Sequence, residues 1–386
     1  MFKELLNKVN DLRKKQNTIL RYVSSVTNNN LNIKPHKELS PLGWHLIHCV
    51  YIEAVWIRSK LLNENYIEKK LKGIADSTVV TVKDRGKSLP SEENLFKISK
   101  KIFTENIIIL ENTILKKSNK KKFDKLKYYI DFLNQHHAQH IENIKNILNI
   151  FFVKFGKFPL NIATNPDPKI YRFVGTKIKG GYYKIGSSEE SFSYDNELPS
   201  HFVNLMDFTI SINVLTVSEW LGFMADGGYK KKEFWTKKGW YWKCKYNILH
   251  PFNWKYLNKK KFVIATYNGF KAPTKNTPVS NISRFELKAF AKYTSHRLPH
   301  EYEWEAAFNK INNKFKVWEW SSNKFFGYEG FKSYPYKEYS IPWFNNNYYS
   351  LRGGSVYTAN EIKRASFRNF YKPSTRYIMS GGRLCL

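Results

Sequence analysis

Apolar positions in the first part of the chain recur at intervals of three and four residues, the spacing of one face of an α-helix. Four such stretches are present, at residues 2–23, 41–63, 91–117 and 122–152. Ser40 and Pro41 fit the start of the second stretch, because a hydroxyl cap followed by proline is typical of a helix N-terminus. The pattern therefore predicts a four-helix bundle.

The helical periodicity is lost near residue 155, where a segment rich in proline and asparagine begins. Further on, short aromatic-rich runs alternate with Gly, Pro and Asn, and helical patches occur near residues 216–225 and 283–308. Short strands with frequent turns indicate an irregular α+β domain. We expect three parts: a helical domain over residues 1–155, a linker over 156–172 and an α+β domain over 173–386.

The composition is that of a globular protein. The 386 residues are 42% hydrophobic, and a chain of this length can form two domains with proper cores. We find no apolar stretch long enough to span a membrane and no signal-peptide pattern. The three cysteines are scattered and match neither a disulfide framework nor a zinc motif. We therefore expect a cytoplasmic protein with no membrane partner.

The formal net charge of +32 raises nucleic acid or an anionic membrane as partners. The lysines, however, are spread through the whole chain, together with abundant Asn, Ile and Tyr. No RNA-binding signature, zinc finger or phosphate-binding loop accompanies them. We interpret the charge as compositional drift on solvated faces and expect no nucleic-acid partner. The oligomeric state has no signature in the sequence.

Three histidines fall on inward-facing stripes of two predicted helices. His48 shares a face with Trp44 and Tyr51, and His136 shares a face of the last helix with His140. Because His136 and His140 are four residues apart, they lie one turn above each other and can bind one metal ion together. A third imidazole from another helix would leave coordination positions open for substrate and dioxygen. The spacing predicts a metal site and hence an enzyme.

The chain lacks the glutamate that a zinc hydrolase needs as general base. In the H-E-x-x-H motif this residue follows the first histidine, where the chain has His137. An all-imidazole site with vacant positions suits iron(II) and oxygen chemistry, although the ligand type alone also permits zinc. We expect His45 and His137 to point elsewhere, around the ligands or at the surface. Glu53 and Glu142 could replace a ligand or orient an imidazole N–H, and we expect both outside the ligand set.

A series of short motifs runs through the second half. In order, they are G-G-Y-Y-K-I-G-S (180–187), Y-D-N-E-L-P-S-H (194–201), D-G-G-Y (226–229), R-L-P-H-E-Y-E-W-E (297–305), V-W-E-W-S (317–321), L-R-G-G-S (351–355), R-A-S-F-R-N-F (364–370) and G-G-R-L (381–384). In this order and spacing they resemble the formylglycine-generating-enzyme, or sulfatase-modifying-factor, family, whose fold is C-type-lectin-like α+β. His300 stands where that family usually has threonine, and we expect it to be exposed.

The first half carries W-x-L-x-H at residues 44–48 and H-x-x-Q-H at 136–140, and it resembles a DinB-like four-helix bundle. A fusion of the two folds in this order looks like the iron(II)-dependent sulfoxide synthases of ergothioneine biosynthesis. The resemblance implies Fe(2+) as cofactor, with His48, His136 and His140 as ligands. It also implies that Gln139 contacts the imidazole of hercynine, and that the other substrates are O2 and a cysteine-type thiol.

The carboxylates of such a thiol call for guanidinium partners, and Arg85 and Arg376 are the candidates. A phenol can act as general acid toward reduced oxygen. The candidates are in the loop Y-P-Y-K-E-Y, namely Tyr334, Tyr336 and Tyr339. Arg368 in F-R-N-F is expected to be structural.

Several alternatives stay open. Tyr371 and Thr375 depart from the pattern of the γ-glutamylcysteine-using branch, so the thiol is either γ-glutamylcysteine or cysteine. Related activities are an ovothiol-type synthase, which joins cysteine to histidine, and a selenium-transferring enzyme. A copper-dependent formylglycine-generating enzyme is disfavoured because the cysteines do not form the required pair. The non-enzymatic alternative is a lectin-like binding protein with a vestigial metal site.

Overall fold

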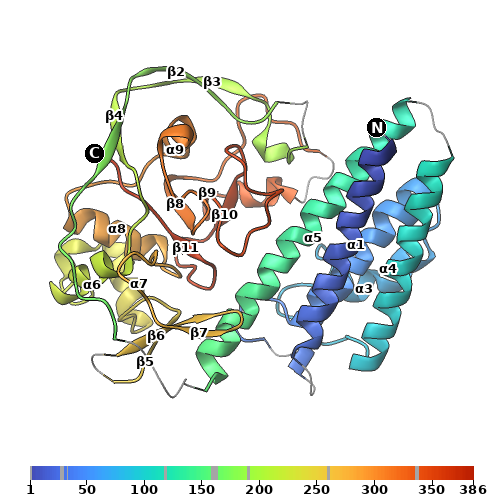
Figure 1. Cartoon of the computed structure of the whole chain (residues 1–386), viewed down its shortest axis with the longest axis horizontal. Coiled ribbons are helices and arrows are strands. Elements are labelled where there is room, and N and C mark those ends of the chain that lie inside the picture. Colours follow the sequence, from blue (N-terminus) through green and yellow to red (C-terminus); the bar gives the residue numbers. More distant parts are fainter. Residues whose placement is uncertain are drawn as a thin grey trace. The chain divides into compact units, whose positions relative to one another are not determined.

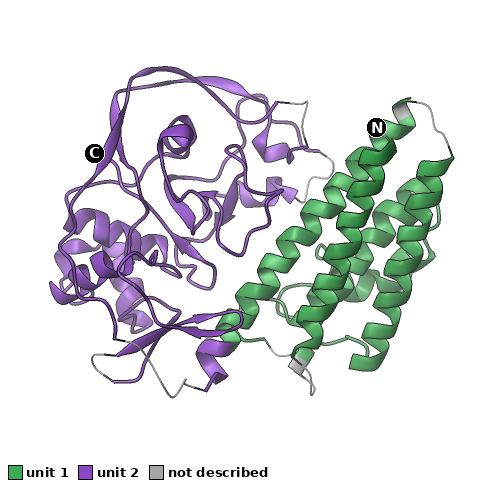
Figure 2. Ribbon diagram, in the orientation of Figure 1, with its two compact units in different colours: residues 1–151 green, residues 152–386 purple. Residues whose placement is uncertain are grey.

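The computed structural model describes residues 2–26, 30–32, 34–116, 120–157, 164–188, 192–258, 261–334 and 339–386. The chain divides into two compact units, residues 1–151 and residues 152–386 (Figure 2). The first unit is helical, whereas the second combines short helices with short strands (Figure 1). Each unit is described by itself below.

Long helices dominate the first unit. The helical elements, in order, are α1 (Phe2–Ser24), η1 (Asn30–Asn32), α2 (Leu42–Glu53), the π-helical segment η2 (Ala54–Leu62), α3 (Tyr66–Ala75), α4 (Glu92–Leu115) and α5 (Lys120–Phe155). The four predicted stretches correspond to α1, to α2 with η2, to α4 and to α5. The short helix α3 was not predicted. It has four lysines and glutamates among ten residues, and only Leu71 and Ala75 are buried.

Helix α2 is buried on all sides. Eleven of its twelve residues are buried, with Ile52 the exception. Its sequence, L-G-W-H-L-I-H-C-V-Y-I-E, is apolar around the whole circumference, as is typical of a helix in the middle of a core. Polar side chains on any face of α2 therefore lie inside the unit and need partners there.

One buried carboxylate joins helices of the first unit. Gln16 on α1 donates to both oxygens of Glu53 on α2, at 2.8 and 3.0 Å, and Asn106 on α4 donates to Oε2 at 3.0 Å. His137 Nε2 on α5 lies 2.8 Å from Glu53 Oε1. We refer to Gln16, Glu53, Asn106 and His137 as the Glu53 cluster. All four side chains are buried, so this cluster fixes the arrangement of α1, α2, α4 and α5.

The second unit consists of short elements. Its helices are η3 (Asp195–Glu197), α6 (Val217–Ala225), η4 (Lys232–Phe234), α7 (Lys237–Lys245), α8 (Arg284–Tyr293), α9 (Glu301–Ala306), η5 (Phe308–Lys310) and η7 (Ile341–Trp343). Its strands are β1 (Gly175–Ile178), β2 (Gly181–Ile185), β3 (His201–Leu205), β4 (Phe208–Ser211), β5 (Trp254–Tyr256), β6 (Phe262–Thr266), β7 (Gly269–Lys271), β8 (Trp318–Lys324), β9 (Tyr349–Gly353), β10 (Asn369–Tyr371) and β11 (Ser380–Gly381). The largest sheet has the order β10-β9-β8-β11, with β8 antiparallel to β9 and parallel to β11.

The motif residues of the second half form buried ion pairs. Arg368 donates from two nitrogens to Glu301, both at 2.8 Å, and Arg383 pairs in the same way with Glu319. Burial would raise the pKa of Glu301, but the guanidinium groups of Arg368 and Arg352 lower it to about 2. Paired, hydrogen-bonded charges of this kind hold a core with little regular structure together. Arg368 is therefore structural, as expected.

Two expectations for the second half need correction. The predicted helical patch at 283–308 is two helices, α8 and α9, because Pro299 and the turn before it interrupt the run. His300, expected to be exposed, is partly buried and caps α9, where its Nδ1 accepts from the backbone N–H of Tyr302 at 3.2 Å. An imidazole nitrogen there takes the capping role of the threonine hydroxyl. No helix within the described residues is long and apolar enough to cross a membrane.

Candidate metal centre

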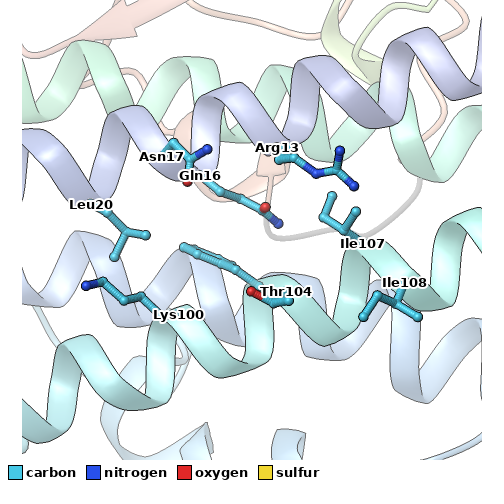
Figure 3. Close-up of a pocket in the computed structure, with 9 residues that line it drawn as sticks. Arg13, Gln16, Asn17, Leu20, Lys100, Thr104, Ile107 and Ile108 are labelled. Carbon is cyan, nitrogen blue, oxygen red and sulfur yellow. The ribbon is translucent and has the colours of Figure 1, made fainter.

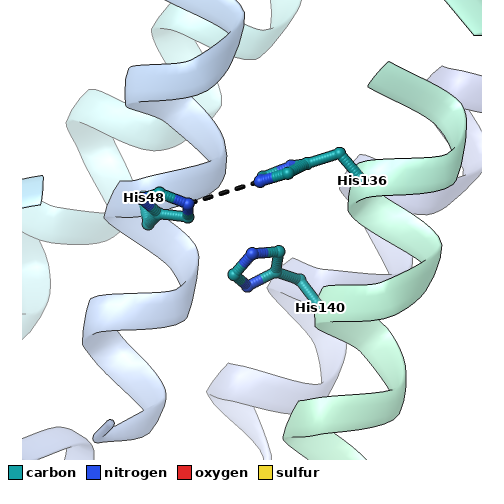
Figure 4. Close-up of side chains that lie close together, drawn as sticks. All are labelled: His48, His136 and His140. Carbon is teal, nitrogen blue, oxygen red and sulfur yellow. Dashed lines mark hydrogen bonds between the residues drawn. The ribbon is translucent and has the colours of Figure 1, made fainter. Parts of the chain in front are cut away.

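The three predicted ligands lie together inside the helical unit (Figure 4). His48 projects from α2, and His136 and His140 project from successive turns of α5 toward it. His48 Nε2 and His136 Nε2 are 3.3 Å apart, and one ring nitrogen from each of the three side chains lies within 4.8 Å of the others. Such converging nitrogens can bind one metal ion. Their role as ligands stays a prediction.

The environment keeps these imidazoles uncharged. Burial lowers the pKa of His48 to about 4. Burial also moves the pKa values of His136 and His140 well below the ordinary value, and the neighbouring histidines lower them further. A metal ion binds the neutral form of imidazole, so the site does not have to lose protons at neutral pH before a metal binds.

A backbone carbonyl orients His48. Its Nδ1 lies 2.7 Å from the carbonyl oxygen of Ala75, the last residue of α3. Because a carbonyl only accepts, Nδ1 carries the proton and Nε2 presents its lone pair toward His136. The tautomer that a metal ligand requires is therefore set by α3, the helix that was not predicted.

His45 and His137 are both buried, with exposures of 5% and 0%, so of the two expected places, around the ligands or at the surface, the surface is ruled out. His45 Nδ1 lies 2.8 Å from His140 Nδ1, and His137 belongs to the Glu53 cluster. Burial lowers the pKa of His45 to about 3. The reason for His45 is that it lies three residues before His48, next to it on a helix that is surrounded by protein, where it also reaches His140. Glu53 thus contacts His137 and none of the predicted ligands.

A second group of ligand atoms shares one member with the first. Cys49, His136 and His137 also bring one potential ligand atom each within 4.8 Å of the others. Burial raises the pKa of the Cys49 thiol well above its ordinary value, and Glu53 adds to that effect. The thiolate that a metal would need is therefore disfavoured, and we regard the three-imidazole group as the candidate centre.

Arg85 lies beside this centre. Its guanidinium carbon is 4.0 Å from the centre of the Trp44 ring, and Trp44 stacks on His48 with ring centroids 4.5 Å apart. Its hydrogen bonds go to neutral acceptors, the Ser40 hydroxyl and the carbonyls of Ser77 and Val80. Within the part of the chain that the structure describes, Arg85 forms no ion pair, while burial lowers its pKa to about 10.

The other two predicted substrate contacts differ in their surroundings. Gln139 lies on α5 between His136 and His140 and is partly exposed. Arg376 belongs to the second unit, where its Nε lies 2.9 Å from Glu286 and its Nη2 donates to Glu286 and to the His250 carbonyl. Glu286 therefore already neutralises this guanidinium. The predicted roles of Gln139 and Arg376 in substrate binding stay predictions.

Asp195, which was not singled out from the sequence, contacts the chain next to two of the predicted tyrosines. Tyr336 lies outside the described residues. Tyr339 stacks on Tyr194, with ring centroids 4.2 Å apart, and Tyr334 is 56% exposed. Asp195 accepts from the Tyr334 backbone N–H at 3.4 Å and from the hydroxyl of Ser340, and burial raises its pKa to about 6. Its signal was the Y-D-N-E motif, which carries Tyr194 and Asp195 side by side.

A surface pocket lies between α1 and α4 (Figure 3). It is lined by Arg13, Gln16, Asn17, Leu20, Lys100, Phe103, Thr104, Ile107 and Ile108. None of the predicted ligands or substrate contacts is among these residues. Gln16 connects this pocket to the Glu53 cluster, since the same amide donates to Glu53.

Comparison with known proteins identifies part of the second unit. Residues 172–316 match the family model of the sulfatase-modifying factor enzyme 1-like domain. Together with the helices that precede it, the domain confirms the predicted fold class, a helical region followed by an α+β sulfatase-modifying-factor fold. PvdO from Pseudomonas aeruginosa, a solved structure, is 14% identical with a TM-score of 0.40, over 55% of this chain and 93% of that one.

Three curated relatives carry the name hercynine oxygenase. The chain is 27% identical over 250 residues to the protein of Mycolicibacterium thermoresistibile and 29% identical over 246 residues to that of Mycobacterium tuberculosis. It is 28% identical over 259 residues to the protein of Mycolicibacterium smegmatis. These matches cover 52–54% of this chain and 55–60% of the relatives, so the chain spans little more than half of their length. The predicted resemblance to this group of enzymes is confirmed.

Proposed function

We propose that the protein is an iron(II)- and dioxygen-dependent sulfoxide synthase that joins a cysteine-type thiol to C2 of the hercynine imidazole. The observation that carries the proposal is the group of three neutral imidazoles contributed by α2 and α5, two of them buried and one partly buried. The similarity to hercynine oxygenases supports the substrate, because their name states what those proteins act on.

The residues at the centre fit an iron(II) ion. His48, His136 and His140 offer three neutral nitrogen donors, and the carbonyl of Ala75 fixes the tautomer of the first. When bound, iron(II) supplies the redox chemistry by which dioxygen is reduced, and three protein ligands leave positions vacant for exogenous groups.

Arg85 is proposed to bind a carboxylate of the thiol substrate. Its guanidinium lies against Trp44, makes bonds to neutral acceptors and has no described acidic partner, so an incoming carboxylate would supply the missing counter-charge. Gln139 is proposed to hydrogen-bond the hercynine imidazole, since it lies on α5 between two of the ligands. Arg376 is the weaker candidate for carboxylate binding, because Glu286 already pairs with it.

The reaction balances with one molecule of dioxygen. The imidazole C2–H and the thiol S–H bonds are broken, a C–S bond forms, one oxygen atom ends on sulfur, and the other leaves as water with both hydrogens. One proton must be delivered to reduced oxygen during this process, and we propose a phenol of Tyr334, Tyr336 or Tyr339 as the donor. Single Tyr→Phe variants identify it, because only loss of the donor should reduce kcat without weakening substrate binding.

The function is tested by aerobic incubation with iron(II), using hercynine or histidine together with cysteine or γ-glutamylcysteine. Mass spectrometry should detect a hercynine–thiol sulfoxide that is absent with His48→Ala. The preferred thiol is read from the same experiment, and a histidine–cysteine adduct would indicate the ovothiol-type reaction instead. Absence of a hercynine sulfoxide with either thiol would contradict the proposal.

A further inference from the structure

We propose that His45 is a positioning residue, which selects the nitrogen that His140 presents to the metal. The inference rests on the three-imidazole metal site proposed above and adds a fourth imidazole that is outside the ligand set. His45 Nδ1 and His140 Nδ1 are 2.8 Å apart, and both side chains are buried. A contact this short between two neutral rings requires one hydrogen between the two nitrogens.

Only one of the two arrangements allows His140 to bind a metal through Nε2. If His140 Nδ1–H donates to His45, the lone pair of His140 Nε2 is free. If His45 Nδ1–H donates instead, the proton of His140 is on Nε2, which then cannot be a ligand. The tautomer of His45 and the competence of His140 are therefore linked. In the productive arrangement, the proton of His45 is on Nε2.

The surroundings of His45 leave it free to adopt that tautomer. Its Nε2 is buried and has no hydrogen-bond partner among the described residues, so no other group opposes protonation there or holds Nδ1–H in place. Trp44 packs against its ring edge-on, with centroids 5.5 Å apart, while the same indole stacks flat on His48. One tryptophan thus fixes the orientations of His45 and of a predicted ligand together.

In this arrangement, a hydrogen bond from Nδ1 orients both His48 and His140, but the two acceptors differ. The Nδ1 of His48 donates to a backbone carbonyl, and the Nδ1 of His140 donates to the His45 imidazole. Removal of such an outer partner typically lowers metal affinity by about 10–100-fold. We expect a loss of this size when His45 cannot accept a hydrogen bond.

Two variants of the full chain separate positioning from packing. His45→Asn keeps an acceptor at the distance of Nδ1 from the backbone, whereas His45→Leu fills the space without one. Anaerobic Fe(2+) and Co(2+) titrations should show about 10–100-fold weaker binding for His45→Leu and near-wild-type binding for His45→Asn. The unfolding midpoint of each metal-free variant shows whether it is folded, and His48→Ala serves as the control without a site.

The tautomer itself can be observed with Zn(2+) as a diamagnetic probe. Long-range 1H–15N spectra of the zinc-loaded wild-type protein should show a proton on His140 Nδ1 and on His45 Nε2. A proton on His45 Nδ1, or equal metal affinity of folded His45→Leu and wild type, would overturn the inference. If the wild-type protein binds no metal, both the proposed function and this inference fail. If the wild-type protein binds metal and His45→Leu binds it equally well, only this inference is overturned.

Discussion

Glu53 Oε1 on α2 lies 2.8 Å from His137 Nε2 on α5, and both side chains are completely buried. The carboxylate accepts from Gln16 and Asn106, so α1 and α4 each contribute one residue to the cluster. His137 follows directly after His136, one of the predicted ligands. The Glu53 cluster therefore fixes α2 against α5 beside the place where their histidines converge.

Replacement of Glu53 by alanine should destabilise the protein strongly. The buried amides of Gln16 and Asn106 would lose their acceptor and His137 its neighbouring carboxylate, and breaking a buried charge network typically costs about 3–5 kcal/mol of unfolding free energy. Urea denaturation of the metal-free protein measures this. Glu111→Ala is the matched control, because the Arg13–Glu111 pair is solvent-exposed and should contribute less than about 1 kcal/mol. Similar losses in both variants would contradict the role of the cluster.

The His136→Ala variant should lose stoichiometric iron binding. This side chain is one of three converging donors, and its Nε2 lies 3.3 Å from that of His48. Anaerobic loading with iron(II), followed by gel filtration and metal analysis, gives the stoichiometry. Cys49→Ala is the companion variant, because Cys49 belongs only to the alternative group. If iron is retained in His136→Ala, or lost in Cys49→Ala, the three-imidazole centre is wrong.

Substitution of Arg85 should weaken binding of the thiol. Removal of a hydrogen bond to a charged group costs about 1.5–3 kcal/mol, equivalent to roughly 10–100-fold in kcat/KM. We expect this loss for Arg85→Leu, mainly as an increase in KM for the thiol, and a smaller loss for Arg85→Lys, which keeps the charge without the planar fork. Arg13→Lys is the control. An unchanged KM in Arg85→Leu would place the carboxylate elsewhere.

The metal-free protein should lose stability as the pH falls below about 6.5, the usual pKa of histidine. Burial lowers the pKa of His45 to about 3 and that of His48 to about 4, so both stay neutral while the unfolded chain takes up protons. The unfolded state then binds more protons, and stability decreases by about 1.4 kcal/mol per pH unit for each such proton. The loss continues until the folded pKa is reached.

Urea denaturation between pH 7.5 and pH 5 measures this slope. The His48→Asn variant removes one of the titrating groups, so its slope should be lower by about one proton. A metal-free protein with pH-independent stability over this interval would show that these histidines are already solvated. Such a result would also remove the argument that the centre is neutral.

The convergence of His48, His136 and His140 could be predicted from helical spacing and helix faces, while their role as ligands stays a prediction. His136 and His140 are one turn apart on any helix, and His48 is on the face of α2 that meets α5. The contact between His45 and His140 was not predicted, because α2 is buried on nearly all sides and no polar stripe in its sequence marks an outer face. Helical periodicity distinguishes faces only when one of them is polar.

Other parts of the site have no local signal in the sequence. The acceptor for His48 is the Ala75 carbonyl. Every residue has a backbone carbonyl, so only its position in the fold distinguishes this one. The Glu53 cluster brings together residues from four helices, with Gln16 and Glu53 separated by 37 positions. The order of the motifs, by contrast, predicted the fold class of the second unit. Its buried ion pairs require Arg and Glu at fixed positions, such as Arg368 and Glu301.

Trp44 lies almost parallel to His48, at an angle of 14°, and is only 2% exposed. An indole in direct contact with a metal-binding imidazole responds to the electronic state of that ring. Arrival of a paramagnetic ion at the centre should therefore quench the emission of Trp44. The part of the emission that comes from Trp44, one of 11 tryptophans, would then report metal occupancy of the proposed centre without a label or a substrate.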